Sequence, residues 1–273
     1  MAINQSAESG RSVYCEVPVQ KRMDYPHYQA ARELVCRYCR TGSVLDLGCS
    51  DLVASLQLSE CGFNVYGTDL DLSSLNLARK NSARAKLFQA NLPHLPIGAQ
   101  NSIDTVLLLD VLEHLNAEEA KNLLVHLAKN AQVPLSIIVS MPIISWASIA
   151  CWQERLSMLK TRRRPATGLF DRTHRILETR EGHHRLFSTC GYTIAEEYYT
   201  SWDEGVSGDW KTVTRPELPR HRPRLRAYLA LTEEVVPRVI HPLDKTKRAD
   251  VRRALKEYQG LYVLQPKKLG SSP

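Results

Sequence analysis

In the first half of the chain, short unbroken apolar runs alternate with segments whose apolar residues recur every three to four positions. Short apolar runs are typical of strands buried on both faces, and the wider spacing is typical of amphipathic helices. Their alternation predicts an α/β fold with a parallel sheet. We expect strands at 43–47, 64–68, 86–90, 103–109 and 135–139, and helices at 51–61, 72–82 and 117–131.

The second half is less regular. We expect a helix at 144–159, a polar loop at 160–174, and a helix that starts at Thr179, a residue type favoured at N-caps, and ends at Gly191. Two further strands, at 192–196 and 261–264, complete the sheet. The predicted organisation is an N-terminal helical lid (1–42), an α/β core (43–199), a substrate-side insertion (200–257) with two helices near 225–236 and 245–257, and a final strand and tail (258–273).

Composition agrees with a globular protein that buries a sizeable core. The 273 residues are 43% hydrophobic and 24% charged, a balance that argues against global disorder. The polar start of the chain lacks the apolar region of a secretory signal, the seven cysteines form no dense framework, and the uncharged stretch 132–153 contains prolines. We therefore expect reduced thiols, no transmembrane segment and a cytoplasmic location. The pattern does not indicate an oligomeric state.

The net charge of +7 is unevenly distributed: residues 1–145 carry −2 and residues 146–273 carry +9. A basic half suits an anionic partner or substrate, although a solvated surface would give the same charge count. The basic stretches lack densely interleaved aromatic residues, and no recognised RNA-binding module is present. The sequence therefore favours a small-molecule substrate over nucleic acid.

A strand, a glycine turn and a spaced carboxylate point to a cofactor that contains adenosine. Val44-Leu-Asp-Leu-Gly-Cys-Ser50 leads from a strand into a turn, and Asp69 ends the next strand, 21 residues after Gly48. Small turn residues let the backbone approach a ligand at the carboxyl edge of the sheet. A carboxylate after the second strand can accept hydrogen bonds from both ribose hydroxyls.

These segments resemble the class I S-adenosylmethionine-dependent methyltransferases. The resemblance covers about 43–199 and the final strand, and includes Asp110-Val-Leu-Glu-His114 and Phe170-Asp-Arg-Thr-His174. The second of these segments is similar to one found in many bacterial methyltransferases of small molecules and cell-surface sugars. The resemblance implies a doubly wound, mostly parallel, Rossmann-like sheet of seven strands with an antiparallel last strand, and S-adenosyl-L-methionine across the carboxyl ends of the first strands.

The resemblance also implies the contacts of this cofactor. Asp69 would hold the ribose hydroxyls, and Leu70 would flank the adenine. Asn91 would accept from the adenine amino group, and Leu92 would offer its backbone N–H to the ring. The methionine and ribose side would be lined by Asp46, Gly48, Cys49 and Ser50.

One position departs from the family pattern. The turn usually reads Gly-x-Gly-x-Gly, but this chain has Gly48-Cys-Ser-Asp-Leu52. A leucine does not easily adopt the positive φ that a glycine tolerates. Two interpretations stay open: Leu52 packs under the following helix, or cofactor binding is altered or lost.

Three polar side chains follow the fourth strand, where the acceptor and the methyl group should meet. Ubiquinone-pathway O-methyltransferases and small-RNA terminal 2′-O-methyltransferases look similar here, and the resemblance implies a metal that holds the accepting oxygens. The candidate ligands are Asp110, Glu113, His114 and His174. Carboxylates suit a hard ion and imidazoles a transition metal. Alternatively, Glu113 and His114 stabilise the turn, or an imidazole is the general base for a hydroxyl proton.

The sequence therefore predicts an S-adenosylmethionine-dependent methyltransferase of small-molecule biosynthesis, with a hydroxyl oxygen as the acceptor. Its candidate catalytic residues are Asp110, His114 and His174. Two alternatives remain: an RNA methyltransferase, and a protein of this fold that no longer transfers methyl groups.

Overall fold

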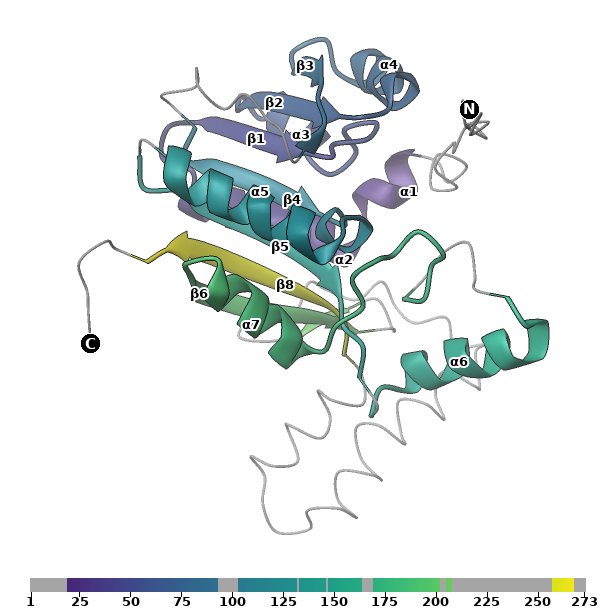
Figure 1. Ribbon diagram of the computed structural model, residues 1–273. Coiled ribbons are helices and arrows are strands. Elements are labelled where there is room, and N and C mark those ends of the chain that lie inside the picture. The colour runs from purple at the N-terminus through teal and green to yellow at the C-terminus, as the bar shows by residue number, and fades with distance from the viewer. Residues whose placement is uncertain are drawn as a thin grey trace, which may run out of the picture.

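The computed structural model describes residues 19–92, 103–131, 133–145, 147–163, 169–201, 205–207 and 257–267. A mixed sheet runs through this part of the chain, with helices on both faces (Figure 1). The strand order is β3-β2-β1-β4-β5-β8-β6-β7. The strands are β1 (Ser43–Leu47), β2 (Asn64–Asp69), β3 (Lys86–Gln89), β4 (Thr105–Leu109), β5 (Ser136–Pro142), β6 (Tyr192–Ser201), β7 (Gly205–Ser207) and β8 (Glu257–Pro266).

The sheet has the predicted topology. Strands β1 to β5 pair in parallel, and β8 lies antiparallel between β5 and β6. Strand β1 pairs with both β2 and β4, so the chain leaves β1 towards one edge of the sheet and later returns towards the other. Ligands of doubly wound folds bind outside the carboxyl ends of the strands at such a switch point. The fold prediction is confirmed, and the short β7 adds one antiparallel strand beside β6.

At the starts of some helices, side chains accept the first backbone N–H groups. The Asp71 and Thr179 side chains accept backbone N–H groups at the starts of α4 and α7, and Asn116 and Glu119 form a capping box on α5. The helices are α1 (Val19–Met23), α2 (Pro26–Tyr38), α3 (Leu56–Glu60), α4 (Leu72–Asn81), the 3-10 helix η3 (Leu112–His114), α5 (Ala117–Asn130), α6 (Ile149–Thr161) and α7 (Arg180–Thr189).

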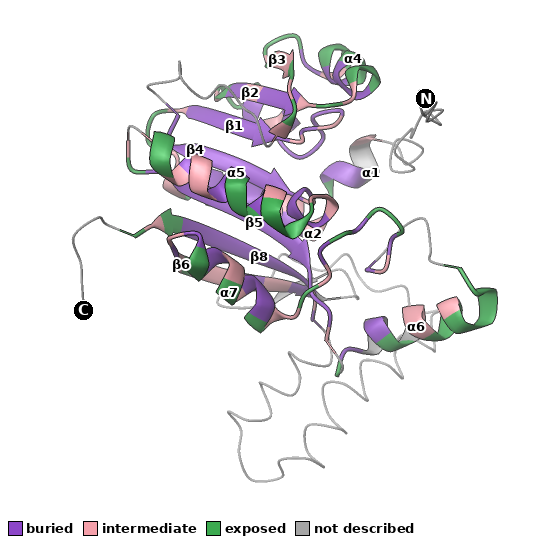
Figure 2. Ribbon diagram, viewed as in Figure 1, coloured by how far each residue is buried: buried purple, intermediate pink, exposed green. Residues whose placement is uncertain are grey.

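The sheet separates two hydrophobic cores. One core packs α5 and α7 against one face, and the other packs α2 and α4 against the opposite face. Because both faces are covered, every residue of β1, β4 and β5 is buried, which explains why these strands read as continuous apolar runs (Figure 2).

Some predicted boundaries were wrong. The helix expected at 51–61 forms only at Leu56–Glu60, because Leu52 has a φ of 71° and cannot belong to a right-handed helix. The helix expected at 144–159 starts at Ile149, because the preceding backbone pairs with Glu178. Strand β6 extends beyond 196 to Ser201. The helices expected near 225–236 and 245–257 lie outside the described residues, except that Glu257 begins β8.

None of the described helices combines the length and the apolar character that crossing a bilayer requires.

Candidate functional site

The turn after β1 passes close to the segment after β4. Gly48 has a φ of 70°, and a Cβ atom built on it would lie 2.7 Å from a methyl group of Val111. Real Cβ contacts are not this short, so this position requires glycine for both its backbone angle and its space. The close approach brings together the predicted cofactor turn and the predicted acceptor segment at the switch point of the sheet.

Leu52 packs into the protein. Its side chain is fully buried in the core beneath α2 and α4. A Cβ atom built on Gly67 would lie 3.1 Å from Leu52 Cδ1, so the leucine packs closely against this glycine. The packing expected in the first interpretation is therefore observed, and the effect of Leu52 on cofactor binding stays a prediction. The branched side chain points into the core while its backbone keeps the left-handed conformation that a glycine would supply.

The Asp69 carboxylate is fixed at the carboxyl edge of the sheet. Its Oδ2 atom accepts the N–H of Ser50 at 2.8 Å, and its Oδ1 atom accepts the N–H of Asp71 at 2.8 Å. Each carboxylate oxygen has two lone pairs, so each can accept one further hydrogen bond. The carboxylate is thus oriented in advance and retains the capacity to accept two hydroxyl groups.

The other predicted cofactor residues lie around this turn at different depths. Asp46 is 2% exposed and accepts the hydroxyl of Ser55. Burial raises its carboxyl pKa to about 6, against the opposing effect of Ser55, and the charge of Asp69 raises it further. Cys49 is buried and its N–H bonds the Thr68 carbonyl, whereas the remaining predicted positions, Leu70, Asn91 and Leu92, are exposed or partly exposed.

Asp110 receives hydrogen bonds from three separate elements. It has a φ of 59°. Its carboxylate accepts from His27 Nε2 at 3.0 Å and from the Tyr28 hydroxyl at 3.2 Å, both on α2. It also accepts from the Ser140 hydroxyl on β5 at 2.8 Å and from the Gln259 amide on β8. Burial opposes ionisation, but His27 and the other donors outweigh it and hold the carboxyl pKa below its ordinary value.

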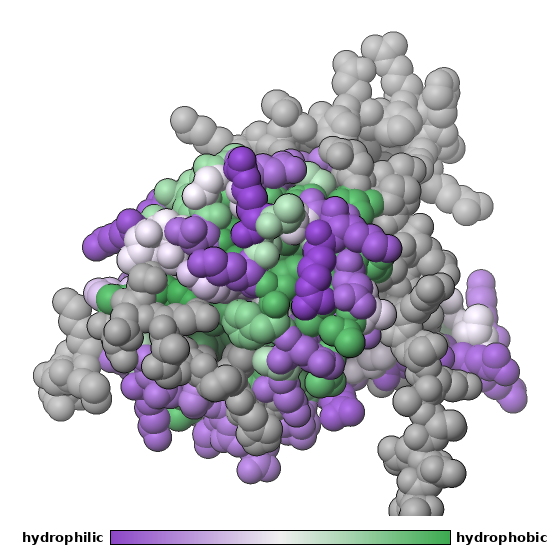
Figure 3. All heavy atoms as spheres, turned by 90° about the horizontal axis from the view of Figure 1, so that it is seen from above, coloured by the Kyte–Doolittle hydropathy of each residue, from purple (hydrophilic) through white to green (hydrophobic). Residues whose placement is uncertain are grey.

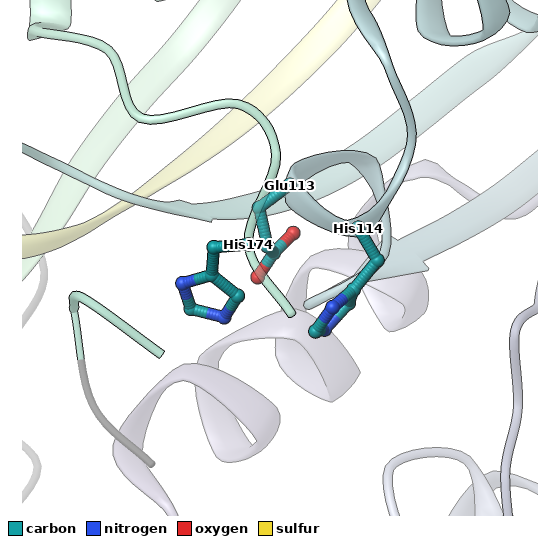
Figure 4. A group of neighbouring side chains, drawn as sticks. All are labelled: Glu113, His114 and His174. Carbon is teal, nitrogen blue, oxygen red and sulfur yellow. The ribbon is translucent and has the colours of Figure 1, made fainter. Parts of the chain in front are cut away.

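Three of the four predicted metal ligands lie together. Glu113 and His114 come from η3, and His174 comes from the loop before α7. One ligand-type atom from each of them lies within 4.8 Å of the others. The Glu113 carboxylate lies between the two imidazole rings, whose centroids are 4.9 Å apart (Figure 4). Asp110 is not part of this cluster, because its carboxylate is engaged by α2, β5 and β8.

Hydrogen bonds fix the tautomer of both imidazoles. His174 Nδ1 lies 3.0 Å from the Leu169 carbonyl, which can only accept, so Nδ1 carries the proton. The Thr173 hydroxyl donates to Asp171 at 2.8 Å, so its oxygen accepts from His114 Nδ1 at 3.1 Å. In the neutral form, both rings therefore have their lone pair on Nε2.

The charge states follow from burial. Glu113 is 2% exposed, and burial together with the nearby Asp110 raises its carboxyl pKa well above the ordinary value. Its Oε2 atom is buried without a hydrogen-bond partner among the described residues. Burial and the neighbouring His174 lower the pKa of His114. At neutral pH, His114 is therefore a neutral imidazole, the form that can take a proton or bind a cation.

The sequence alone did not reveal the partners of Asp110. His27 and Tyr28 were expected in a lid helix, without a partner across the sheet. Gln259 lies 149 residues from Asp110 along the chain, and a lone glutamine in an apolar strand gives no signal of function. Only the position of β8 beside β5 brings it there.

Comparisons with known proteins identify a domain within the chain and structures with a similar fold. Residues 44–131 match a family model described as a methyltransferase domain. No curated protein matches the sequence of the chain. The matched segment runs from β1 to the end of α5, so it contains the glycine turn, Asp69 and the η3 segment.

Solved structures share the fold at low identity. A S-adenosylmethionine-dependent methyltransferase from Methanosarcina mazei is 14% identical, with a TM-score of 0.55 over 86% of this chain and 97% of that chain. Magnesium protoporphyrin IX methyltransferase from Synechocystis PCC 6803, solved with bound S-adenosylhomocysteine, is 18% identical, with a TM-score of 0.51 over 91% and 87%. The methyltransferase domain of bacterial CtHen1 is 14% identical, with a TM-score of 0.52 over 90% and 99%.

At these identities the structural likeness establishes the fold, and the sequence match establishes the domain. Residues 44–131 thus match a methyltransferase domain, and the chain shares the fold of solved S-adenosylmethionine-dependent methyltransferases.

Proposed function

We propose that the protein transfers the methyl group of S-adenosyl-L-methionine to a hydroxyl oxygen of a small-molecule acceptor. The observation that carries this proposal is the cluster of Glu113, His114 and His174, whose two imidazoles carry their lone pairs on Nε2 in the neutral form. An amine acceptor can lose its proton to water, whereas a hydroxyl gains most from a base held at the site.

The cofactor and the acceptor would meet between the turn after β1 and the segment after β4. Gly48 lies against Val111, the residue that follows Asp110, so the two segments adjoin. Asp69 would hold the ribose, and the Gly48 turn would allow the backbone to pass close to the ligand. The remaining proposed cofactor contacts are those of Asp46, Cys49, Ser50, Leu70, Asn91 and Leu92.

Two effects would accelerate the reaction: alignment of the two reactants and removal of the hydroxyl proton. The bound cofactor would supply a methyl group attached to a positively charged sulfonium sulfur. After transfer, the C–S bond electrons would stay on the sulfur, and the leaving group would be S-adenosylhomocysteine. His114 Nε2 would take the hydroxyl proton as the acceptor oxygen bonds to the methyl carbon. Holding the two reactants in line supplies much of the rate in such a displacement. Asp110 fixes α2 against the sheet beside this point, through His27 and Tyr28.

A divalent cation fits the same three side chains. A buried carboxylate oxygen without a partner and two imidazoles with oriented lone pairs form a donor set that binds transition metals. The cation would be held by Glu113, His114 and His174. It would then take the place of His114 as the activating group, because its positive charge lowers the pKa of a bound hydroxyl. The charge would also compensate the ionised form of the buried Glu113.

Calorimetric titration tests the cofactor half of the proposal. The wild-type protein is expected to bind S-adenosyl-L-methionine and S-adenosylhomocysteine, and Asp69→Asn is expected to weaken both at least tenfold, because a charge-assisted hydrogen bond contributes about 1.5–3 kcal/mol. Glu60→Gln, an exposed residue at the end of α3, is the matched control for the loss of one negative charge. A folded wild-type protein that binds neither nucleoside would overturn the proposal.

A labelled-methyl assay tests the acceptor half. Protein and tritiated S-adenosyl-L-methionine are incubated with paired phenols and anilines, and with paired catechols and aminophenols, each with and without a chelator. Methylation of the hydroxyl compounds, reduced at least a hundredfold by His114→Ala, supports the proposal. Methylation confined to the amines, or to added RNA, contradicts it. Loss of activity with the chelator assigns the cation an essential part.

A further inference from the structure

One face of α6 exposes large apolar side chains. Trp152, Leu156 and Leu159 are 49%, 53% and 75% exposed. They follow one another at intervals of four and three residues, so they lie on the same face of the helix. In the described part of the chain, the other exposed large apolar side chains are Leu70, Leu72 and Leu77, near α4, which are 64%, 49% and 39% exposed.

The opposite face anchors α6 to the protein. Cys151 is buried against Ile144 and Leu169. The Glu154 carboxylate accepts the backbone N–H groups of Leu169 and Phe170, each at 3.1 Å. These contacts hold the helix at one end of the sheet, where it extends away from the strands (Figure 1) with an exposed outer surface (Figure 2).

The exposed side of α6 is basic. Glu154 is the only acidic residue of the helix, and its carboxylate is turned inward to bind backbone. The Arg155 guanidinium lies 5.9 Å from the Trp152 ring centroid, and Lys160 and Arg162 are exposed at the end of the helix, followed by the exposed Arg163. Exposed tryptophan and leucine beside lysine and arginine are typical of helices that lie in a membrane interface.

The α4 region differs in this respect. The surface seen from above, over β2, β3 and α4, shows hydrophobic side chains interspersed with hydrophilic ones (Figure 3). Its leucines are not aligned on one face of a projecting helix, since Leu70 precedes α4 and Leu72 and Leu77 are five residues apart.

The size of the α6 face favours a lipid surface over a protein partner. A helix of 13 residues is about 20 Å long and about 10 Å wide, so one face covers about 200 Å². A stable protein interface needs about 800 Å² on each partner. Binding to a bilayer needs no matching surface, because apolar side chains enter the acyl boundary and each basic residue near anionic headgroups adds about 1 kcal/mol.

We propose that α6 docks on an anionic lipid bilayer, with Trp152, Leu156 and Leu159 at the boundary of headgroups and acyl chains. Arg155, Lys160, Arg162 and Arg163 lie at the level of the lipid phosphates. The attachment is peripheral and reversible, because one short apolar face and a few basic residues do not hold a protein on a membrane permanently.

Vesicle sedimentation tests this proposal with the full chain, in the absence of cofactor and acceptor. Vesicles of phosphatidylcholine with one-quarter phosphatidylglycerol are expected to bind the wild-type protein, and vesicles of phosphatidylcholine alone to bind it at least tenfold more weakly. The double variant Leu156→Glu/Leu159→Glu is expected to lose at least tenfold in affinity for the anionic vesicles. The matched control is Leu72→Glu/Leu77→Glu on α4, which should bind like the wild type.

Three results would overturn the proposal: equal binding of the two double variants, equal binding to the two kinds of vesicle, or self-association of the wild-type protein in ultracentrifugation that the α6 variant abolishes. Circular dichroism establishes that each variant is folded. Because the assay contains no methyl donor, its failure is distinct from a failure of the proposed methyl transfer.

Discussion

The turn after β1 shows how one residue can combine a conformational cost with a packing gain. Leu52 has a φ of 71°, which costs a non-glycine residue roughly 1–2 kcal/mol. Its side chain is fully buried, which stabilises the fold by roughly 1.5–3 kcal/mol. Burial therefore outweighs or balances the strain, and the family's glycine can be replaced here by a leucine that faces the core.

This balance predicts an unusual order of stability for substitutions at Leu52. Leu52→Ala removes the buried side chain but keeps the strain, and is expected to cost about 2–5 kcal/mol. Leu52→Gly removes both, so it should be at least as stable as Leu52→Ala, the reverse of the usual ranking of alanine over glycine. Urea unfolding of both variants measures the order. A glycine variant clearly less stable than the alanine variant would show that the backbone at this position is not strained.

Asp46 makes the stability of the protein depend on pH. Its carboxyl pKa is about 6 in the folded protein, against about 3.9 for an ordinary aspartate, because burial disfavours the charged form. A raised acid pKa means that the folded state binds the proton more tightly than the unfolded state does. The stability that the protonated Asp46 carboxyl contributes to the folded state is therefore present in full below about pH 4, and it is lost as the pH rises through 6.

Asp46→Asn should abolish this dependence. Between pH 4 and pH 7, the free energy of unfolding of the wild-type protein should fall by about 2 kcal/mol relative to that of the variant, since one pKa unit corresponds to about 1.4 kcal/mol and the unfolded carboxyl is already half ionised at pH 4. Urea unfolding curves at pH 4, 5, 6 and 7 measure the difference. Parallel pH profiles for the two proteins would show that Asp46 titrates normally.

At the scale of elements, Asp110 ties α2 to the sheet. Because a carboxylate only accepts hydrogen bonds, it can receive donors from α2, β5 and β8 at once. In Asp110→Asn, the amide NH2 group is itself a donor, so it cannot accept the hydrogen bonds that the replaced carboxylate oxygen accepted. The helix is expected to lose a large part of its attachment, while the apolar contacts of Leu34 and Val35 remain.

Hydrogen exchange followed by mass spectrometry measures this loss. Peptides covering Pro26–Tyr38 should exchange at least tenfold faster in Asp110→Asn, and peptides from β1 and β4 should not change. Glu33→Gln, an exposed residue of α2, is the control for a change of charge on the helix itself. Uniformly faster exchange over the whole protein would instead assign Asp110 to global stability.

The elements were predicted where one local pattern determined them. Strands β1, β4 and β5 are buried on both faces, so burial alone makes them apolar runs. The early residues of the segment after Gly48 were misread. Val53, Leu56 and Leu58 have helical spacing, but Ser50 and Leu52 have positive φ angles that a right-handed helix excludes. Periodicity reports which residues are buried and does not report backbone angles.

The candidate site was predicted only in part: its clustered residues were predicted, and the partners of Asp110 were not. Glu113, His114 and His174 were predicted together, and the structure brings them together. Asp110 was assigned to the same cluster but bonds His27 and Gln259, which are far away in sequence. Such pairings depend on the order of strands in the sheet, and no local signal encodes them.

At the scale of the whole molecule, a divalent cation at the cluster would raise the melting temperature. Binding to the folded state alone adds about 2.7 kcal/mol at a concentration one hundred times the dissociation constant. For a protein of this size, that corresponds to a rise of about 5–10 °C. Chelator-treated protein should show this rise in scanning calorimetry with Mn²⁺ or Co²⁺.

Two variants test whether the cation binds at the cluster. His174→Ala should remove most of the rise, whereas His126→Ala on α5, which lies outside the cluster, should retain it. An equal rise in both variants would place the cation elsewhere, and no rise in the wild-type protein would favour His114 acting as a base without metal.

The hydrogen bonds at Leu169 connect α6 with the cluster of Glu113, His114 and His174. The N–H of Leu169 is held by Glu154 of α6, and its carbonyl holds the imidazole of His174. One peptide segment thus serves the projecting helix and the candidate cluster at once. Thermodynamic linkage is reciprocal, so any factor by which lipid attachment changes affinity for a ligand at His174 must also be the factor by which that ligand changes affinity for lipid. This segment is therefore where a coupling between occupancy of the cluster and attachment to a surface would be transmitted.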